Sequence, residues 1–357
     1  MSEITEKVRV TGPLAIELPA MTNQGISVVV PSFERLRLLE NLLRTLARER
    51  SGLAVSSEVI VSDSSPAPLV PAVKGLCESF SARYLRSRSR NPAVSRNDGI
   101  KAAMYPVILF VDSDCEAEPG LLAAHIKAYR CGKTGGVTGV TRFTGENGPG
   151  YRLMECTPFV RPFLFPVTQK KVSWAPASNI SYRRDVLDIA GGFDEHIPAN
   201  GGEDVMLGWK VTGAGHEILC STEAVVTHAK ETWNGLIAVL RRAVKWGRAD
   251  CHIVMAFPSR TRACPHFAAL FFLISLPSTA FLTFVFGRYW LFAPTGCLAA
   301  AVACKALHEA RYGRSGAPFL PRMGGALLIL AFEISYVLEC LRRKPPAIFL
   351  APAHDDD

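Results

Sequence analysis

Two patterns of apolar residues alternate along the chain between Gly25 and Arg142. Residues 26–30 form a run of mostly β-branched residues, as expected of a strand that is buried on both faces. The leucines that follow have the spacing of one helix face, at Leu39, Leu42, Leu43 and Leu46. Further strands are predicted at Glu58–Val61, Arg83–Leu85 and Val107–Val111, and a further helix at Asn97–Met104. This alternation indicates an α/β domain with a parallel, doubly wound sheet.

The ends of the predicted strands select three candidate ligand-binding segments. Ligands of doubly wound sheets bind beyond the carboxyl ends of the strands. That rule selects Pro31–Arg35, Ser62–Ser65 and Asp112–Glu116. Residues 143–175 are rich in Gly, Pro and aromatic residues, so we expect an irregular excursion there, before a helix that begins near Glu203.

The apolar residues of the last third follow a different pattern. Phe267–Gly287 carries no charge and is long enough to span a hydrocarbon core of ~30 Å as a helix. A second run, Tyr289–Cys304, is marginal in length, and a third, Met323–Leu341, carries Glu333 and Glu339. Glu333 would be costly in lipid and should therefore face protein, water or ligand. A buried helical hairpin in a soluble domain is the alternative interpretation of all three runs.

A basic amphipathic stretch precedes these runs. It combines an apolar stripe with interleaved cations: Trp233, Leu236, Ile237, Leu240 and Val244, with Arg241, Arg242, Lys245 and Arg248. The pattern is typical of a helix that lies on an anionic membrane surface. Packing of this helix on the preceding domain is an equally open alternative. The basic linker residues Lys305, Arg311, Arg314 and Arg322 place the predicted loop, and with it the N-terminal domain, on the cytoplasmic side.

These patterns divide the chain into five predicted regions. They are a tail at 1–24, an α/β domain at 25–232, an interface-helix region at 233–262, two or three membrane-associated helices at 263–344 and a tail at 345–357. The first 24 residues contain Glu3 and Glu6 and no long apolar core, so we expect no secretory signal there.

Composition and charge narrow the classes of partner. The chain has 357 residues, of which 48% are hydrophobic, and 40 Lys and Arg against 32 Asp and Glu give a net charge of +8. A disordered chain is excluded by this composition, and the charge suits nucleic acid, an anionic membrane or anionic small molecules. The sequence contains no pattern of a known nucleic-acid-binding module, so no nucleic-acid partner is expected. The ten cysteines form neither a CxxC pair nor a zinc-ligand pattern, which indicates reduced thiols.

Asp112 and Asp114 are the strongest candidates for chemistry. They flank Ser113 directly after the predicted strand Val107–Val111. Side chains at i and i+2 of an extended segment point the same way, and two carboxylates can hold a hard divalent cation that keeps open sites for phosphate. Mg²⁺ or Mn²⁺ is the expected ion. A solvated turn after a strand is the competing interpretation.

Other polar residues gain meaning only in combination. Glu203 and Asp204 begin a predicted helix. Their negative charges are either simply stabilised there by the helix dipole, or one of them supplies a general base. Arg96 and Asn97 follow a row of arginines, Arg86, Arg88 and Arg90, which would suit a diphosphate or form a solvated loop. His228, after a strand-like run, matters only if it reaches the metal.

The order of six short motifs resembles the family 2 inverting glycosyltransferases of the GT-A fold, over about residues 25–250. The motifs are the Val-Val-Val-Pro-Ser-Phe-Glu-Arg start, the Ile-Val-Ser-Asp-Ser-Ser strand end, Arg-Asn-Asp-Gly-Ile, Asp-Ser-Asp, Gly-Gly-Phe-Asp-Glu and Gly-Glu-Asp-Val-Met-Leu-Gly-Trp. The late part resembles mycofactocin-type and related membrane-bound glycosyltransferases. The resemblance implies a GT-A doubly wound mixed sheet, followed here by a hydrophobic helical membrane region.

The resemblance also implies roles for individual residues. Asp204 would be the general base with Glu203 beside it, and Asp114, Asp112 and His228 would hold Mn²⁺ or Mg²⁺. The donor would be contacted by Pro31, Ser32, Glu34, Asp63, Arg90, Arg96, Asn97 and Asp112. The sugar or acceptor would be approached by Ser178, Asn179, Asp194 and Glu195. Two positions depart from the family pattern, because Glu34 stands where Asn is usual and a single Asp63 replaces an aspartate pair.

The expected activity is therefore transfer of a sugar, with inversion, from a nucleotide-diphospho-sugar to a hydroxyl. A UDP-sugar is the expected donor, and a lipid-linked or glycan acceptor and a membrane are the expected partners. Two alternatives stay open: a membrane-anchored binding subunit without catalysis, and a sugar-nucleotide nucleotidyltransferase. The second would need a Gly-rich triphosphate loop after the first strand, where this chain has Pro31-Ser32-Phe33-Glu34.

Overall fold

The structure of the chain is a computed structural model. It describes residues 25–129, 132–197, 201–264, 266–286, 296, 298–300, 302–303, 319–343 and 345–353. The predicted tail at 1–24, most of the second apolar run and the linker residues Lys305, Arg311 and Arg314 lie outside these residues.

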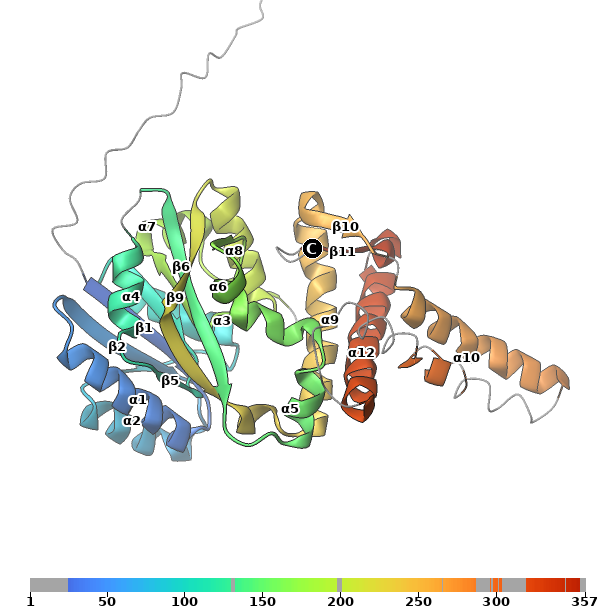
Figure 1. Cartoon of the computed structure of the whole chain (residues 1–357), viewed down its shortest axis with the longest axis horizontal. Coiled ribbons are helices and arrows are strands. Elements are labelled where there is room, and N and C mark those ends of the chain that lie inside the picture. Colours follow the sequence, from blue (N-terminus) through green and yellow to red (C-terminus); the bar gives the residue numbers. More distant parts are fainter. Residues whose placement is uncertain are drawn as a thin grey trace, which may run out of the picture.

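A mixed sheet forms the centre of the N-terminal domain (Figure 1). Nine strands belong to it within the described residues, in the order β3-β2-β1-β4-β8-β6-β9-β5, with β7 paired to β9. The first four strands are parallel, whereas β8 runs antiparallel to both β4 and β6. The strands are β1 (Gly25–Ser32), β2 (Ser56–Asp63), β3 (Arg83–Arg86), β4 (Val107–Val111), β5 (Cys115–Ala117), β6 (Thr134–Thr144), β7 (Lys171–Val172), β8 (Asn179–Arg183) and β9 (Glu217–Ala229).

Helices cover both faces of this sheet. On one face the leucine stripe of α1 packs on β1, β2 and β4 together with α2 and α4. On the other face α3, α7 and α8 enclose a second core around Phe110 and Trp209. The helices are α1 (Leu36–Ser51), α2 (Val70–Ser79), α3 (Pro92–Ala102), α4 (Leu121–Ala128), α7 (Arg184–Ala190) and α8 (Glu203–Gly213). The expected α/β doubly wound mixed sheet is confirmed.

Most predicted elements appear with small shifts in their bounds. α3 begins at Pro92, five residues before its predicted start at Asn97, because the side chain of Asn91 accepts a hydrogen bond from the Ala93 N–H and caps the helix. The excursion at 143–175 contains α5 (Pro149–Met154), the 3-10 helix η2 (Pro158–Leu164) and α6 (Phe165–Thr168).

Three long helices extend beyond the sheet. α9 (Leu236–Ala256) and α12 (Phe319–Arg343) lie side by side, and α10 (Phe267–Phe286) runs away from the rest of the molecule (Figure 1). α9 and α12 approach closely at Gly247, where an added Cβ would lie 2.1 Å from the Phe332 carbonyl oxygen. Two 3-10 turns, η3 (Lys230–Trp233) and η4 (Pro258–Arg260), flank α9, and β10 (Thr261–Ala263) pairs with β11 (Leu350–Pro352) after the turn η6 (Pro345–Phe349).

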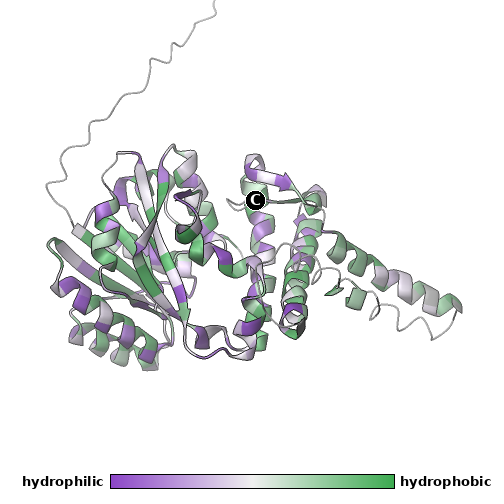
Figure 2. Ribbon diagram, viewed as in Figure 1, coloured by the Kyte–Doolittle hydropathy of each residue, from purple (hydrophilic) through white to green (hydrophobic). Residues whose placement is uncertain are grey.

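Two helices among the described residues are long and apolar enough to cross a membrane, by length and composition. The window in α10 is only 12% buried, and most of the ribbon of this helix has the green of apolar residues (Figure 2). The window in α12 is 56% buried, mainly against α9. Glu333 of α12 is buried and lies 3.6 Å from His266 Nδ1, which confirms the prediction that it faces protein.

Three residues of the apolar stripe that was predicted to contact a membrane are exposed on α9. Leu236, Ile237 and Leu240 are exposed by 51%, 67% and 44%, whereas the buried stripe of this half of the helix is formed by Val239, Ala243 and Gly247. Small residues face α12 because the two backbones approach closely there, so the larger side chains remain outside. The cations also separate, since Arg241 is exposed whereas Arg242 is turned toward the sheet domain.

Candidate active site

A cavity of about 540 Å³ lies beyond the carboxyl ends of β1 and β4. Its floor comes from the loops after these two strands, at Pro31–Ser32 and Asp112–Asp114. The start of α8 adds Glu203 and Asp204, and β9 adds His228. α9 closes the remaining side with Arg242, Lys245 and Trp246. The cavity thus collects residues from segments far apart in the sequence.

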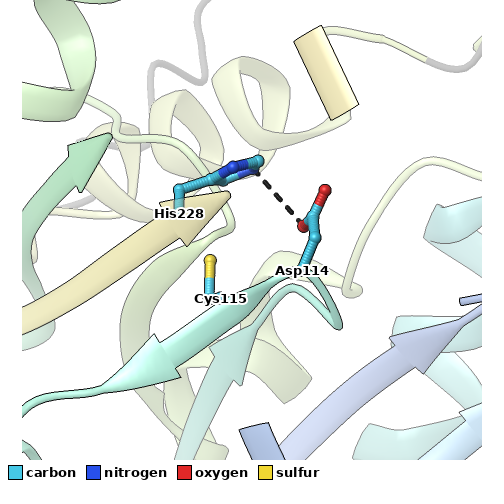
Figure 3. Close-up of side chains that lie close together, drawn as sticks. All are labelled: Asp114, Cys115 and His228. Carbon is cyan, nitrogen blue, oxygen red and sulfur yellow. Dashed lines mark ion pairs between the residues drawn. The ribbon is translucent and has the colours of Figure 1, made fainter. Parts of the chain in front are cut away.

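Asp114 and His228 face each other across neighbouring strands (Figure 3). The register of β5 on β9 pairs Cys115 with His228, and this places the imidazole beside the preceding residue, Asp114. His228 Nε2 lies 3.4 Å from Asp114 Oδ1, and Arg35 forms an ion pair with Oδ2. Burial alone would raise the pKa of Asp114, but His228 and Arg35 outweigh burial and lower it. Asp114 is therefore held as a carboxylate.

These residues fit a divalent cation. Asp114, Cys115 and His228 each offer one ligand atom, and the three atoms lie within 4.8 Å of one another. A carboxylate and an imidazole that open onto a cavity leave coordination positions for phosphate oxygens, as hard ions such as Mn²⁺ require. Burial, together with Asp114 and Asp112, raises the pKa of the Cys115 thiol well above its usual value. Asp114 and His228 line the cavity, whereas Cys115 packs in the core beneath α1, so the donors that open on the cavity are oxygen and nitrogen.

Arg96 connects Asp112 to the start of α8. Its guanidinium is buried and donates to Asp112 Oδ1 at 2.9 Å and to Glu203 Oε1 at 2.7 Å. The guanidinium also lies over the Phe193 ring, 5.4 Å from the ring centre. The ion pair with Arg96 fixes the position of the Glu203 carboxylate at the start of α8, beside Asp204.

Asp204 has the properties of a general base. Burial and, to a smaller extent, the carboxylate of Glu203 raise its pKa to about 7, although Arg96 acts in the opposite direction. Its Oδ1 accepts a hydrogen bond from the Val205 N–H at 2.9 Å. A carboxyl group that titrates near neutral pH and lines a cavity is able to take a proton from a bound hydroxyl group.

α9 contributes to the cavity two cations, Arg242 and Lys245, which the sequence pattern predicted to lie on a membrane surface. Arg242 lies over the rings of Trp233 and Trp246, at 4.0 and 6.0 Å from the ring centres. Burial lowers its pKa to about 10, while the carboxylate of Asp114 opposes the shift. Its Nη1 is buried and has no hydrogen-bond partner among the described residues. The spacing of Val239, Arg242 and Trp246 on one helical face was the missed signal.

Ten of the predicted site residues line the cavity: Pro31, Ser32, Arg90, Arg96, Asp112, Asp114, Ser178, Glu203, Asp204 and His228. Arg90 lies over the Phe33 ring, 5.0 Å from its centre. The cavity also includes Arg35, from a predicted ligand-binding segment but without an assigned role, and residues that were not predicted to bind ligand, notably Phe163, Trp233, Arg242 and Trp246.

Two predicted donor residues, Asp63 and Glu34, do not line the cavity. Asp63 is fully buried, and its Oδ1 accepts a hydrogen bond from Ser65 Oγ at 2.6 Å. Ser65 Oγ in turn accepts from the Glu34 backbone N–H at 2.9 Å, while the Glu34 residue itself is exposed at a φ of 55°. Asp63 therefore ties together the loops after β1 and β2 and acts on the cavity only through them.

The remaining predicted residues are used in the framework. Asn179 is buried, donates to Val140 O and Ala224 O and faces His125 Nε2, so it lies within the sheet and does not line the cavity. Asn97 donates to Phe193 O and to Glu195 Oε1. Asp194 accepts from the His196 N–H. These contacts hold Asn97, Asn179, Asp194 and Glu195 in the framework, and none of the four lines the cavity, so their predicted sugar or donor roles stay predictions.

Comparisons with known proteins agree with this arrangement. Residues 27–189 match the family described as Glycosyl transferase family 2. A pre-mycofactocin glycosyltransferase of Mycobacterium tuberculosis is 26% identical over 247 residues, which are 67% of this chain and 50% of the relative. A validoxylamine A glucosyltransferase of Streptomyces hygroscopicus subsp. jinggangensis is 25% identical over 56% of this chain and 54% of the relative. The chain thus spans about half the length of the curated relatives it matches.

A solved structure supports the fold. A mannosyltransferase from Pyrobaculum calidifontis, in complex with GDP-Man and Mn²⁺, superposes with a TM-score of 0.54 at 19% identity. The superposition covers 87% of this chain and 86% of the mannosyltransferase. The predicted GT-A type of α/β fold is confirmed by this likeness. Residues 27–189 thus match the glycosyltransferase family 2 domain, and the likeness to the mannosyltransferase shows the fold.

Proposed function

We propose that this protein is a metal-dependent, inverting glycosyltransferase that uses a nucleotide-diphospho-sugar donor. The observation that carries the proposal is the position of Asp204, with a pKa raised to about 7, in the same cavity as the Asp114–His228 pair. A base for the acceptor and a cation site for the leaving diphosphate are the two parts that such a transfer requires.

The proposed reaction uses several residues that line the same cavity. Asp204 takes the proton of the acceptor hydroxyl while the oxygen of that hydroxyl forms a bond to the anomeric carbon. The bond from that carbon to the diphosphate oxygen breaks on the opposite face, so the configuration inverts. Asp114 and His228, with Asp112 near them, would hold the divalent ion, which neutralises negative charge on the diphosphate when it is bound. Arg90 and Arg242 add positive charge on the same side.

The identity of the nucleotide is a finer proposal. We retain a UDP-sugar as the donor and treat GDP as its main competitor, since the similar mannosyltransferase was solved with GDP-Man and Mn²⁺. Pro31 and Ser32 end β1 beside the cavity, with Ser64 from the loop after β2. These loops would hold the base and ribose, at the position where doubly wound sheets bind nucleotides.

We further propose that the enzyme works at a membrane, with the catalytic domain on the cytoplasmic side and a lipid-linked or glycan acceptor. The support is the length and apolar surface of α10, together with the exposed Leu236, Ile237 and Leu240 on α9. An apolar anchor next to the cavity would keep a lipid-borne acceptor near Asp204.

The proposal is tested by titrating detergent-solubilised protein with UDP, GDP and TDP in a calorimeter, with and without Mn²⁺. We expect one nucleotide to bind in a Mn²⁺-dependent way, and the corresponding nucleotide sugars then define the transfer assay. Nucleotide binding without any transfer would favour the alternative of a non-catalytic binding subunit. Release of pyrophosphate from a nucleoside triphosphate and a sugar phosphate would favour a nucleotidyltransferase. Folded protein that binds none of the three nucleotides would refute the donor site.

A further inference from the structure

Arg35 occupies the side of Asp114 that faces the cavity. Its Nη1 forms an ion pair with Asp114 Oδ2, and His228 lies 3.4 Å from the other oxygen, Oδ1. Both oxygens of the candidate metal-binding carboxylate are therefore engaged by this chain's own cationic or basic groups. A divalent ion that binds Asp114 through Oδ2 must take the place of the guanidinium.

The arginine is held loosely compared with its partner. The Arg35 side chain is 39% exposed, whereas that of Asp114 is 4% exposed. Among the described residues, the pair with Asp114 is the only hydrogen bond or ion pair of the Arg35 side chain. Its backbone is anchored instead, because its carbonyl oxygen accepts from the Leu39 N–H at 2.9 Å at the start of α1. An anchored backbone with a single side-chain contact allows the guanidinium to change partners by rotation of the side chain alone.

Arg96 shows what a fixed arginine looks like in the same cavity. Its side chain is 6% exposed and bridges two carboxylates, Asp112 and Glu203. Releasing Arg96 would leave both acids unpaired, whereas releasing Arg35 leaves one carboxylate, which a metal ion can take over. Of these two arginines, Arg35 is the one able to exchange with a cation.

The charge balance favours such an exchange only when a diphosphate is present. Arg35 and Arg242 both lie near Asp114, and a divalent ion would add two positive charges beside them. Arg242 Nη1 lacks a hydrogen-bond partner in the described structure. The negative charges of a nucleotide diphosphate would offset this excess and offer both arginines bidentate acceptors.

We infer that Arg35 is a resident counter-cation that holds Asp114 until a nucleotide diphosphate arrives, and then passes from the carboxylate to the diphosphate as the metal ion binds. This inference rests on the proposed donor and metal site. It makes Arg35 a positioning residue, and it makes metal and nucleotide binding mutually dependent. The metal ion would bind weakly to the free protein and tightly to the nucleotide complex.

The test measures Mn²⁺ affinity without nucleotide, from the electron paramagnetic resonance signal of free Mn²⁺. Arg35→Gln removes the competing cation, so we expect Mn²⁺ alone to bind at least about tenfold more tightly than to the wild-type protein. Arg37→Gln is the matched control, because Arg37 is two residues away, exposed, and paired with Glu231 on the surface. We expect its Mn²⁺ affinity to equal that of the wild type.

The same titrations with saturating UDP and with saturating GDP complete the test. The nucleotide that binds should tighten Mn²⁺ binding to the wild type at least about tenfold, and tighten it much less for Arg35→Gln. Damage to the fold would weaken Mn²⁺ binding, so a tighter variant cannot arise from misfolding. Equal or weaker Mn²⁺ affinity of Arg35→Gln without nucleotide would overturn the inference. A failure of the proposed function gives a different result: the wild-type protein then neither binds nucleotide with Mn²⁺ nor transfers sugar.

Discussion

Replacing Asp204 by Asn tests the proposed base through two independent properties. The Asn side chain keeps the size and polarity of Asp but cannot accept the proton of an acceptor hydroxyl. We expect the transfer rate to fall by about 10²–10⁴-fold, the usual contribution of a general base. Nucleotide affinity should change little, because Asp112 and Asp114, which face the diphosphate in our proposal, are untouched.

The same substitution should stabilise the fold at neutral and alkaline pH. Burial raises the pKa of Asp204 to about 7 from an ordinary value of 3.8, so the folded state keeps a proton between those values that the unfolded state has lost. The stability of the wild type therefore falls as pH rises through this window and levels off above about 7. A difference of about three pKa units corresponds to about 4 kcal/mol. The neutral Asn variant lacks this loss, so its advantage should be about 2 kcal/mol at pH 5 and about 4 kcal/mol at pH 8.

Thermal unfolding in detergent, monitored by intrinsic fluorescence, measures this advantage at pH 5 and pH 8. Asp188→Asn is the control, since Asp188 is an exposed aspartate on α7. We expect the midpoint of the Asp204 variant to exceed that of the wild type by several degrees at pH 8, and by less at pH 5. A pH-independent difference would show that Asp204 is not a buried group of raised pKa. A variant that transfers sugar at the wild-type rate would show that Asp204 is not the base.

Four further predictions follow from individual contacts. Arg96→Met leaves the carboxylates of Asp112 and Glu203 without their partner and should lower the free energy of unfolding by about 3–5 kcal/mol, as measured by thermal unfolding. Arg88→Met, at an exposed position, should not. His228→Ala should raise the Mn²⁺ concentration needed for half-maximal transfer at least about tenfold, and an unchanged metal dependence would remove it as a ligand. Ile237→Ser with Leu240→Ser should weaken co-sedimentation with anionic vesicles while transfer in detergent to a soluble acceptor persists. Gly247→Val should force α9 and α12 apart and cost about 1–3 kcal/mol, and an unchanged melting temperature would contradict the close packing.

The sheet and its carboxylates were predictable because their signals are local. A strand such as Val107–Val111 is a short apolar run that is buried on both faces, and Asp112 and Asp114 follow it directly. The rule that ligands bind beyond strand ends then places the two acids at the cavity, whatever the rest of the chain does. The same holds for Asp204, which begins a helix at the sheet edge.

The roles of several polar residues were not predictable because they depend on tertiary partners. Asn179 sits in a motif that suggested sugar contact, but its amide joins β8 to carbonyls of β6 and β9. The contact between α9 and α12 was not predictable for a related reason. The apolar stripe of α9 was assigned to a membrane surface, and nothing in the sequence marked Ala243 and Gly247 as a second face that lets α12 approach. The arginine and tryptophan of the same helix, Arg242 and Trp246, were thereby left for the cavity.

The position of α9 has a practical consequence for anyone who wants a water-soluble form of this enzyme. One face of the helix supplies Arg242 and Trp246 to the cavity, and another face rests on α12. Cutting the chain before the apolar helices would bare the close contact at Gly247, and cutting it before α9 would remove a wall of the cavity. To obtain a soluble form, replacing exposed apolar residues such as Leu236 and Ile237 by polar ones is therefore better than truncation.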